Sequence, residues 1–185
     1  MSAGVSAASV ASKRFLVFVY GTLKTGQPNH HVMKRLGAVK LGDAQTERRH
    51  RLVVGGPYNI PYMFPPLHEG DNGSGGEQRV DGEVYEVDAN AIDFLDEFES
   101  APVMYERKQI ALQSVPAPLP KETVIEGYVL NPSFHLFKEL QQLEPISSYA
   151  DKGEYIPPDS RPVHATKARS ASGNGLPDFA AVKGS

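Results

Sequence analysis

Cysteine is absent from the 185 residues of the chain. Without cysteine, the protein cannot carry a disulfide framework, a thiolate zinc site, an iron–sulfur cluster or a cysteine nucleophile. The chain also lacks an excess of positive charge, because 19 lysine and arginine residues stand against 22 aspartate and glutamate residues. We therefore do not expect a nucleic-acid-binding protein, and any catalysis must use oxygen or nitrogen groups.

Long apolar runs are missing as well. No segment approaches the roughly 20 apolar residues that a membrane-spanning helix requires, so we expect a soluble protein that does not bind membranes. The first 12 residues lack the basic and long apolar regions of a secretory signal, which predicts a disordered leader. A transit peptide is the alternative interpretation, since no acidic residue precedes Asp43, but arginine is almost absent from the leader. We therefore favour a cytoplasmic location.

Neither the histidines nor the glycines form a recognisable ligand site. His30 and His31 are adjacent, so on a helix their side chains would diverge by about 100° and could not face one metal ion. The glycines between Gly73 and Gly76 lack the strand–glycine–helix context of a dinucleotide or phosphate loop. We therefore predict no metal and no cofactor.

The hydrophobic pattern predicts more strands than helices. The strongest strand is RFLVFVY, residues 14–20, which is apolar almost throughout, stops at Gly21 and should be buried on both faces. Residues 55–67 are too rich in glycine and proline for regular structure. We predict a small α+β domain, for which a partly closed barrel is one arrangement. Further strands are expected at residues 79–87, with Gly82 as a bulge, at 105–112 and at 123–130.

The ends of the domain follow from the same pattern. Asn29 is placed to cap a short helix that runs through Leu36, and residues 133–143 predict another short helix. Beyond about Pro157 the chain is rich in serine, glycine and alanine and has no apolar period, which predicts disorder. We therefore expect one domain at residues 13–156, between a leader at 1–12 and a mostly disordered tail at 157–185.

One carboxylate is placed unusually on the helix predicted at residues 89–100. Asp88 is a good N-cap for this helix, and Pro102 closes the segment at its other end. With Ile92 at 0° and 100° per residue, Glu99 falls at about 340°, between Leu95 and Ile92 on the apolar face. The other acids of the helix, which lie outside this arc, are Asp93, Asp96 and Glu97.

This orientation leaves two interpretations of Glu99. Burial and the partial negative charge of a helix C-terminus would both raise the pKa of its carboxyl group, which suits proton transfer near neutral pH. Alternatively, the last helical turn frays, and Glu99 turns to solvent or binds a backbone N–H or Arg107. Periodicity alone does not decide between these interpretations.

Four stretches of sequence together resemble the γ-glutamylcyclotransferase-like, or AIG2-like, superfamily. They are FVYGTLKTGQPNH at residues 18–30, YNIPY at 58–62, GEVYEVD at 82–88, and FLDEFES at 94–100 with the YER that follows at 105–107. The resemblance spans about residues 15–155. The ordered pair of YGTL and FLDEFE makes it specific, because YGTL alone also fits a tight strand exit.

The resemblance implies a mixed, partly closed β-barrel with flanking short helices. It also implies an enzyme that releases 5-oxoproline and a free amine from a γ-glutamyl amine. Within the superfamily the chain is most similar to the γ-glutamylamine cyclotransferases, whose substrates include γ-glutamyl-ε-lysine. The resemblance also implies that the substrate-holding loop consists of Tyr20, Gly21, Thr22 and Leu23, and that Glu99 is the catalytic acid/base.

These residues suit such a cyclisation chemically. The α-amine of the substrate attacks its own γ-carbonyl carbon, so the enzyme needs mainly to fold the glutamyl unit and to move protons. Glu99 would accept a proton from the α-ammonium group and deliver one to the departing amine. Backbone N–H groups of the loop from Gly21 to Leu23 would stabilise the negative charge that develops on the carbonyl oxygen.

Two further segments are assigned to the pocket. Tyr105 either offers its phenol to the α-carboxylate of the substrate or forms the pocket wall, and a core tyrosine is the alternative. Ile60 and Pro61 are placed at the pocket rim, and the bond between them is open to a cis form.

Two other functions stay open beside the favoured one. The first is a cyclotransferase that acts on γ-glutamyl-α-amino acids or glutathione-like peptides, since only the outer pocket separates it from the favoured activity. The second is a non-catalytic domain of the same fold that binds a partner protein. For the favoured function, the expected partner is a small γ-glutamyl substrate only.

Overall fold

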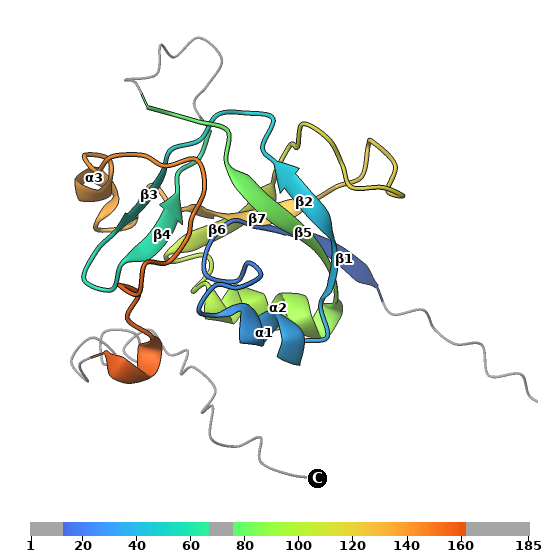
Figure 1. The fold of residues 1–185 in the computed structure, drawn as a ribbon, viewed down its shortest axis with the longest axis horizontal. Helices are drawn as coiled ribbons and strands as arrows, with labels where there is room; N and C mark the ends of the chain where they lie inside the picture. Colours follow the sequence, from blue (N-terminus) through green and yellow to red (C-terminus); the bar gives the residue numbers. More distant parts are fainter. Residues whose placement is uncertain (1–12, 67–75, 162–185) are drawn as a thin grey trace, which may run out of the picture.

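A computed structural model of the chain describes residues 13–66 and 76–161. The predicted leader, most of the glycine-rich segment before Gly76 and most of the predicted tail lie outside these residues. The described part is an α+β fold with two β-sheets, short α-helices and one 3₁₀ helix (Figure 1). This confirms the predicted fold class, although the sheets do not close into a continuous barrel.

A mixed five-stranded sheet forms the centre of the molecule. Its central strand, β1, runs antiparallel to β5 on one side and parallel to β7 on the other. Val17, Phe18 and Val19 of β1 are buried, as predicted for a strand covered on both faces. The chain therefore leaves β1 in the middle of the fold. The strand order is β2 (Val39–Gln45), β5 (Asp81–Asp88), β1 (Arg14–Val19), β7 (Glu126–Leu130) and β6 (Tyr105–Gln109).

The prediction of irregular structure at residues 55–67 was wrong for the described part of that segment. Strands β3 (Leu52–Gly55) and β4 (Ile60–Met63) form an antiparallel hairpin, in which Pro61 pairs with Val54. Both strands of a two-stranded sheet are edge strands, and an edge strand tolerates a proline that lacks a backbone N–H. The connecting turn is formed by Gly56 and Asn59, whose φ angles are 68° and 50°. The Ile60–Pro61 bond is not cis.

The structure differs from the sequence prediction at Gly82 and at Asn29. The register shift in the sheet lies on β2 between Lys40 and Gly42, whereas Gly82 of β5 is not a bulge. A Cβ atom on Gly82 would lie 2.4 Å from Cζ of Phe18, so the glycine permits close packing of β5 on β1. Asn29 does occupy the N-cap position of α1 (His30–Arg35), but its side chain makes no capping hydrogen bond.

The long helix α2 (Ala89–Phe98) covers one face of the core. As predicted, the Asp88 side chain caps it by accepting a hydrogen bond of 2.8 Å from the backbone N–H of Ala91. Ala91, Ile92 and Leu95 are buried, and all three belong to the core cluster that α1 also joins. The apolar arc read from the sequence is therefore the buried face.

The C-terminal part of the described chain is more ordered than predicted. Helix α3 (Phe137–Leu140) is shorter than the predicted residues 133–143. In contrast, Pro158–Ser160 form the 3₁₀ helix η1, although disorder was expected from Pro157 onward. The reason is tertiary, since hydrogen bonds tie the preceding residues Glu154 and Ile156 to the β3–β4 turn, and Arg161 after η1 packs on the Tyr58 ring. The rest of the predicted tail lies outside the described residues.

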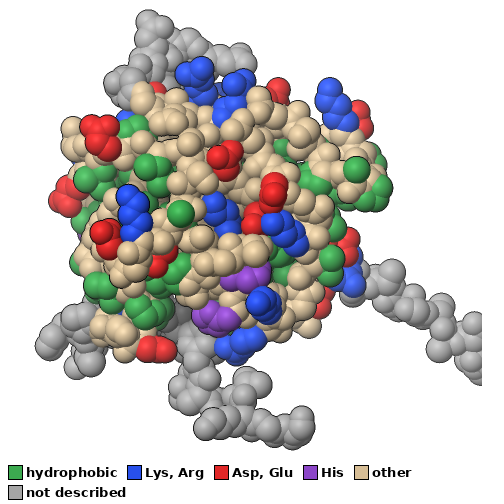
Figure 2. Space-filling model, viewed as in Figure 1, with side chains coloured by type: hydrophobic (Ala, Val, Ile, Leu, Met, Phe, Trp, Pro, Cys, Tyr) green, Lys and Arg blue, Asp and Glu red, His purple; other side chains and the backbone are tan. Residues whose placement is uncertain are grey.

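Two surface properties bear on function. No helix among residues 13–66 and 76–161 is long and apolar enough to cross a membrane. On the face shown in Figure 2, lysine and arginine side chains are interspersed with aspartate and glutamate side chains.

Candidate active site

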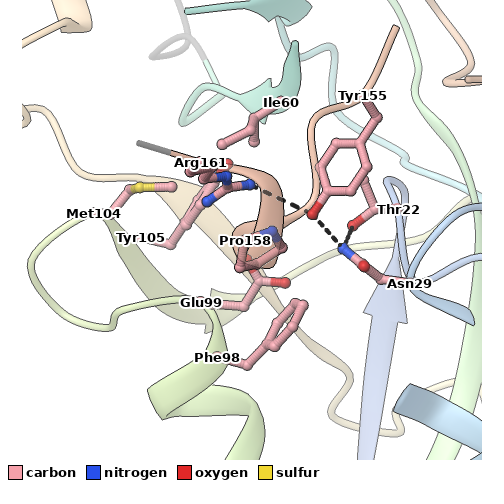
Figure 3. A pocket seen from close by; sticks show the side chains of 10 residues that line it. All are labelled: Thr22, Asn29, Ile60, Phe98, Glu99, Met104, Tyr105, Tyr155, Pro158 and Arg161. Carbon is pink, nitrogen blue, oxygen red and sulfur yellow. Dashed lines mark hydrogen bonds between the residues drawn. The ribbon is translucent and has the colours of Figure 1, made fainter. Parts of the chain in front are cut away.

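Two adjoining cavities open beside the point where the chain leaves β1. The inner cavity has a volume of about 40 Å³. Phe18 and Val19, which line the inner cavity but not the outer one, are buried. The outer cavity has a volume of about 50 Å³, and most of its own lining residues are partly exposed (Figure 3). Both cavities are lined by Thr22, Ile60, Glu99 and Tyr105. The inner cavity adds Phe18, Val19, Tyr20, Gly21, Leu23, Pro61 and Tyr128, and the outer cavity adds Asn29, Phe98, Met104, Tyr155, Pro158 and Arg161.

All eight residues predicted for the site line these cavities. They come from four separate parts of the chain: the loop after β1, strand β4, the end of α2 and the start of β6. The fold therefore brings together side chains that are far apart in sequence. They are Tyr20, Gly21, Thr22, Leu23, Ile60, Pro61, Glu99 and Tyr105.

The direction of Glu99 is set by the way α2 ends. The backbone N–H of Glu99 donates a hydrogen bond of 2.9 Å to the carbonyl of Leu95, so the last turn is intact rather than frayed. The next two N–H groups, of Ser100 and Ala101, donate back to Glu97 and Asp96, which is the Schellman pattern of helix termination. Ser100 takes the left-handed position with a φ of 54°. Glu99 thus keeps its helical direction while the chain turns away.

The Glu99 side chain is partly buried between the two cavities. Figure 3 shows it rising from the end of α2 into the space between Phe98 and Pro158. Arg107, the alternative partner from the sequence, instead binds Asp96 through Nε at 2.9 Å and Glu126 through Nη1 at 2.6 Å. Arg107 is therefore paired with the carboxylates of Asp96 and Glu126.

Three tyrosines surround Glu99 and stay protonated. Burial raises the pKa of Tyr20 well above its usual value, and the charge of Glu99 raises it further. Burial, Tyr20 and Glu99 likewise raise the pKa of Tyr105, and burial, Asp96 and Glu99 raise that of Tyr128. Each phenol is therefore a hydrogen-bond donor at neutral pH.

The phenols of two of these tyrosines donate to backbone carbonyls. The Tyr20 hydroxyl donates to the carbonyl of Tyr128 at 2.8 Å, and the Tyr105 hydroxyl donates to the carbonyl of Pro61 at 3.0 Å. Tyr105 also stacks on Tyr62, with 6.0 Å between ring centroids. Tyr105 is therefore a buried core residue, 2% exposed, which also forms part of the cavity wall, whereas its phenol binds the backbone.

The loop from Tyr20 to Thr25 is held tightly in place. The N–H of Lys24 donates to the carbonyl of Gly21 at 3.1 Å, and the N–H of Asn29 donates to the carbonyl of Thr22 at 2.9 Å. A Cβ atom on Gly21 would lie only 2.7 Å from Cγ of Pro61. Glycine is therefore required here by the close approach of the loop to β4.

Glu83 of β5 anchors the far end of this loop. Its Oε2 atom accepts hydrogen bonds from the backbone N–H and the hydroxyl of Thr25, at 2.8 and 3.0 Å, and from the Tyr85 hydroxyl at 2.7 Å. Its Oε1 atom binds Nζ of Lys40 at 2.7 Å. Burial alone would raise the pKa of Glu83, but these hydrogen bonds outweigh it, so the pKa is lowered. The loop is thus fastened to a carboxylate that stays ionised.

Comparison with known proteins identifies the family of the chain. The family described as "Gamma-glutamyl cyclotransferase, AIG2-like" matches residues 17–119. The chain belongs to this family. It is 48% identical over 108 residues to a "Gamma-glutamylaminecyclotransferase" from Bos taurus, which covers 56% of this chain and 60% of that protein. The protein of the same name from Homo sapiens is 43% identical over 101 residues, covering 53% of this chain and 61% of its own length. The chain thus spans about three fifths of the length of these curated relatives.

A solved structure from the family has the same fold. The crystal structure of an AIG2-like protein from Mus musculus superposes with a TM-score of 0.65 at 33% sequence identity. The similarity covers 80% of this chain and 99% of the mouse protein. The resemblance inferred from the YGTL and FLDEFE stretches is therefore confirmed.

The γ-glutamyl cyclotransferase-like chain also has site residues that the sequence analysis missed. Asn29 is 6% exposed, and its Nδ2 atom donates to Oγ1 of Thr22 at 3.0 Å and to the Tyr155 hydroxyl at 2.8 Å. Arg161 lies with its guanidinium carbon 4.4 Å from the ring centroid of Tyr58. Asn29 could have been assigned to the site, because it belongs to the YGTLKTGQPNH stretch that carries the family resemblance. Tyr155 and Arg161 gave no such signal, because the sequence around them has no periodic pattern of apolar residues.

Tyr155 and Arg161 lie outside residues 17–119, the region matched by the family. Hydrogen bonds from Ile156 to Tyr58 and from Asn59 to Glu154, at 3.1 and 2.9 Å, hold the C-terminal segment against the β3–β4 turn. Figure 1 shows this segment passing along β4 before it reaches η1. Within the described residues, no group of three or more His, Asp or Glu side chains is arranged to hold a metal ion.

Proposed function

We propose that the protein is a γ-glutamylamine cyclotransferase, which converts a γ-glutamyl amine into 5-oxoproline and the free amine. The observation that carries the proposal is the position of Glu99, whose carboxylate lines the same cavity as the loop from Tyr20 to Leu23. The names of the bovine and human relatives support this activity.

In the proposed reaction the substrate supplies its own nucleophile. Its α-amino nitrogen forms a bond to its γ-carbonyl carbon, which closes a five-membered ring, and the bond from that carbon to the leaving nitrogen then breaks. Because the attack is intramolecular, holding the glutamyl unit in a bent conformation contributes much of the rate. The two small adjoining cavities suit this task, since they constrain a ligand from several sides.

Glu99 moves the protons in this scheme. It accepts a proton from the α-ammonium group, which frees the attacking lone pair, and later donates that proton to the departing amine nitrogen. The second proton, which the α-nitrogen loses as it becomes the lactam N–H, also ends on the departing amine, which leaves as an ammonium ion. Its place on the wall shared by both cavities lets one carboxylate reach both nitrogens. The protonated phenols of Tyr20 and Tyr105 line the inner cavity beside it and do not compete as bases.

The loop after β1 has the complementary role. As the γ-carbonyl becomes tetrahedral, its oxygen gains negative charge, which backbone N–H groups of the loop stabilise. Such donors work best when they are already fixed, because no reorganisation is then needed during the reaction. The bonds from Lys24, Thr25 and Asn29 fix this loop.

The proposal also covers the setting of the reaction. The partner is a small γ-glutamyl molecule, since the cavities beside Glu99 are small, with volumes of about 40 and 50 Å³. A cytoplasmic location stays a prediction from the sequence alone.

Replacing Glu99 by glutamine tests the proposal. General acid–base catalysis contributes about 10²- to 10⁴-fold, so Glu99→Gln should lower kcat on γ-glutamyl-ε-lysine by that factor, measured as 5-oxoproline formed. Glu97→Gln is the matched control, because Glu97 lies two residues earlier on α2 and is exposed. Both variants should keep the thermal unfolding temperature of the parent chain.

Three other results would contradict the proposal or favour another function. Parent activity in Glu99→Gln would remove Glu99 from the proton transfer. Release of 5-oxoproline from γ-glutamyl-alanine but not from γ-glutamyl-ε-lysine would favour a cyclotransferase for γ-glutamyl-α-amino acids. Absence of 5-oxoproline with either compound would favour a binding domain.

A further inference from the structure

Arg161 is the one lysine, arginine or histidine among the described residues that line the two cavities. It lines only the outer cavity, where Figure 3 shows its guanidinium group near Ile60 and Tyr155. The other residues that line this cavity are uncharged, except for Glu99. The single positive charge of Arg161 is expected to attract a negatively charged part of a ligand.

The position of this charge is set by several contacts. The Tyr58 ring faces the guanidinium at 4.4 Å, Nε donates to the carbonyl of Ile156 at 3.1 Å, and Nη2 lies 3.5 Å from the Tyr155 hydroxyl. The backbone N–H of Arg161 donates to the carbonyl of Pro158 at 3.1 Å, which closes η1. The side chain is thus held at the cavity rather than extended into solvent.

The proposed function determines which part of the substrate lies near Arg161, and the inference rests on that function. Glu99 and Thr22 lie on the wall between the cavities, so the γ-carbonyl and the bond that breaks belong there. The glutamyl unit fills the inner cavity, beside the loop from Tyr20 to Leu23. The leaving amine then extends into the outer cavity, where Arg161 is located.

We propose that Arg161 binds the carboxylate of the leaving amine and so selects γ-glutamyl amines whose amine portion is an amino acid. A guanidinium group is suited to this role, because its planar N–H donors match the two oxygens of a carboxylate. γ-Glutamyl-ε-lysine carries such a carboxylate at the far end of its leaving group. Arg161 is therefore a specificity-determining residue and takes no part in proton transfer.

A pair of substrates that differ only in this carboxylate tests the inference. In γ-glutamyl-cadaverine a hydrogen atom replaces the carboxylate of the lysine portion. Arg161→Gln should lower the ratio of kcat/KM for γ-glutamyl-ε-lysine over γ-glutamyl-cadaverine by about 10- to 100-fold, the range expected for a lost charge-assisted hydrogen bond. Arg161→Lys should lower the ratio less, since it keeps the charge but not the planar donors.

Lys152→Gln provides the control, because it removes one positive charge from an exposed position on the same segment. It should leave the ratio at the value of the parent chain. An equal loss for both substrates in Arg161→Gln would overturn the inference, because Arg161 would then act on the glutamyl half or on the shape of the cavity. An unchanged ratio would overturn it as well.

A binding measurement separates this inference from the proposed activity. Titration calorimetry of the Glu99→Gln chain with each compound follows recognition without turnover. Tighter binding of γ-glutamyl-ε-lysine that is lost when Arg161→Gln is added supports the inference even where the parent chain releases no 5-oxoproline. Equal affinity for the two compounds, or no binding of either, would refute it.

Discussion

The side-chain amide of Asn29 donates a hydrogen bond of 2.8 Å to the hydroxyl of Tyr155, which lies 126 residues later in the chain. The same nitrogen donates to Oγ1 of Thr22 at 3.0 Å. These two bonds join the loop after β1 to the C-terminal segment that carries Arg161. The inner and outer parts of the site are thus mechanically connected through one buried amide.

Tyr155→Phe should weaken this connection. The buried amide of Asn29 loses one acceptor, so the free energy of unfolding should fall by about 1 kcal/mol in a urea titration. The KM for γ-glutamyl-ε-lysine should rise, because the outer cavity wall is then held less firmly. Tyr58→Phe is the control, since it keeps the ring that faces Arg161. Equal effects of the two substitutions would contradict a specific role for the Tyr155 hydroxyl.

Gly21→Ala should disturb the site through β4. The added Cβ atom would lie 2.7 Å from Cγ of Pro61, and overpacking of this kind costs about 1–3 kcal/mol. Pro61→Ala removes the clashing atom and leaves Cβ at 3.5 Å, so the double variant should regain part of that free energy. Unfolding titrations of all four chains form a double-mutant cycle. Strictly additive losses would show that Pro61 is not what excludes a larger residue at position 21.

Glu83→Gln should loosen the loop from Tyr20 to Thr25 and destabilise the fold. Hydrogen bonds to an ionised group contribute about 1.5–3 kcal/mol, so a loss of about 2 kcal/mol is expected at pH 7. Because the fold lowers the pKa of Glu83, its stabilising effect is complete above the unfolded pKa of about 4.3 and is lost as the pH falls through the folded pKa.

The pH dependence distinguishes this role from simple packing. Urea titrations of the parent chain and Glu83→Gln at pH 7 and pH 3 should give a smaller difference in unfolding free energy at pH 3. Glu86→Gln, on the same strand but more exposed, should have little effect at either pH, since its ion pair with Arg14 is long at 3.8 Å. A difference that stays constant between pH 7 and pH 3 would argue against an ionised anchor.

The sequence predicted those parts of the fold in which local pattern and tertiary structure agree. The apolar run at β1 and the cap of α2 by Asp88 are local signals, and both are confirmed. The helical projection placed Glu99 correctly because the hydrogen bond to Leu95 keeps it in the last turn. Ser100 then reverses the chain without moving that side chain.

The parts that were not predicted depend on contacts between distant segments. Pro61 is typical of a strand break, yet it is accommodated in β4, an edge strand of the two-stranded sheet. The Asn29 side chain fits a helix cap by type, but Thr22 and Tyr155 offer it better-placed partners. Arg161 lies in a polar segment that shows no periodic pattern of apolar residues. Its position at the cavity therefore follows only from its contacts with Tyr58 and Ile156 in the folded chain.

The parallel pairing of β1 with β7 also has a consequence for biosynthesis. Strand β1 is among the first parts of the domain to leave the ribosome, but β7, its neighbour in the sheet, begins only at Glu126. Strand β6 has no place in the sheet until β7 has been made, because β7 lies between β6 and β1. A nascent chain that already contains Glu99 therefore still lacks β6 and β7, the two strands on one side of β1, and the candidate site can assemble only after the residues up to Arg161 have been made.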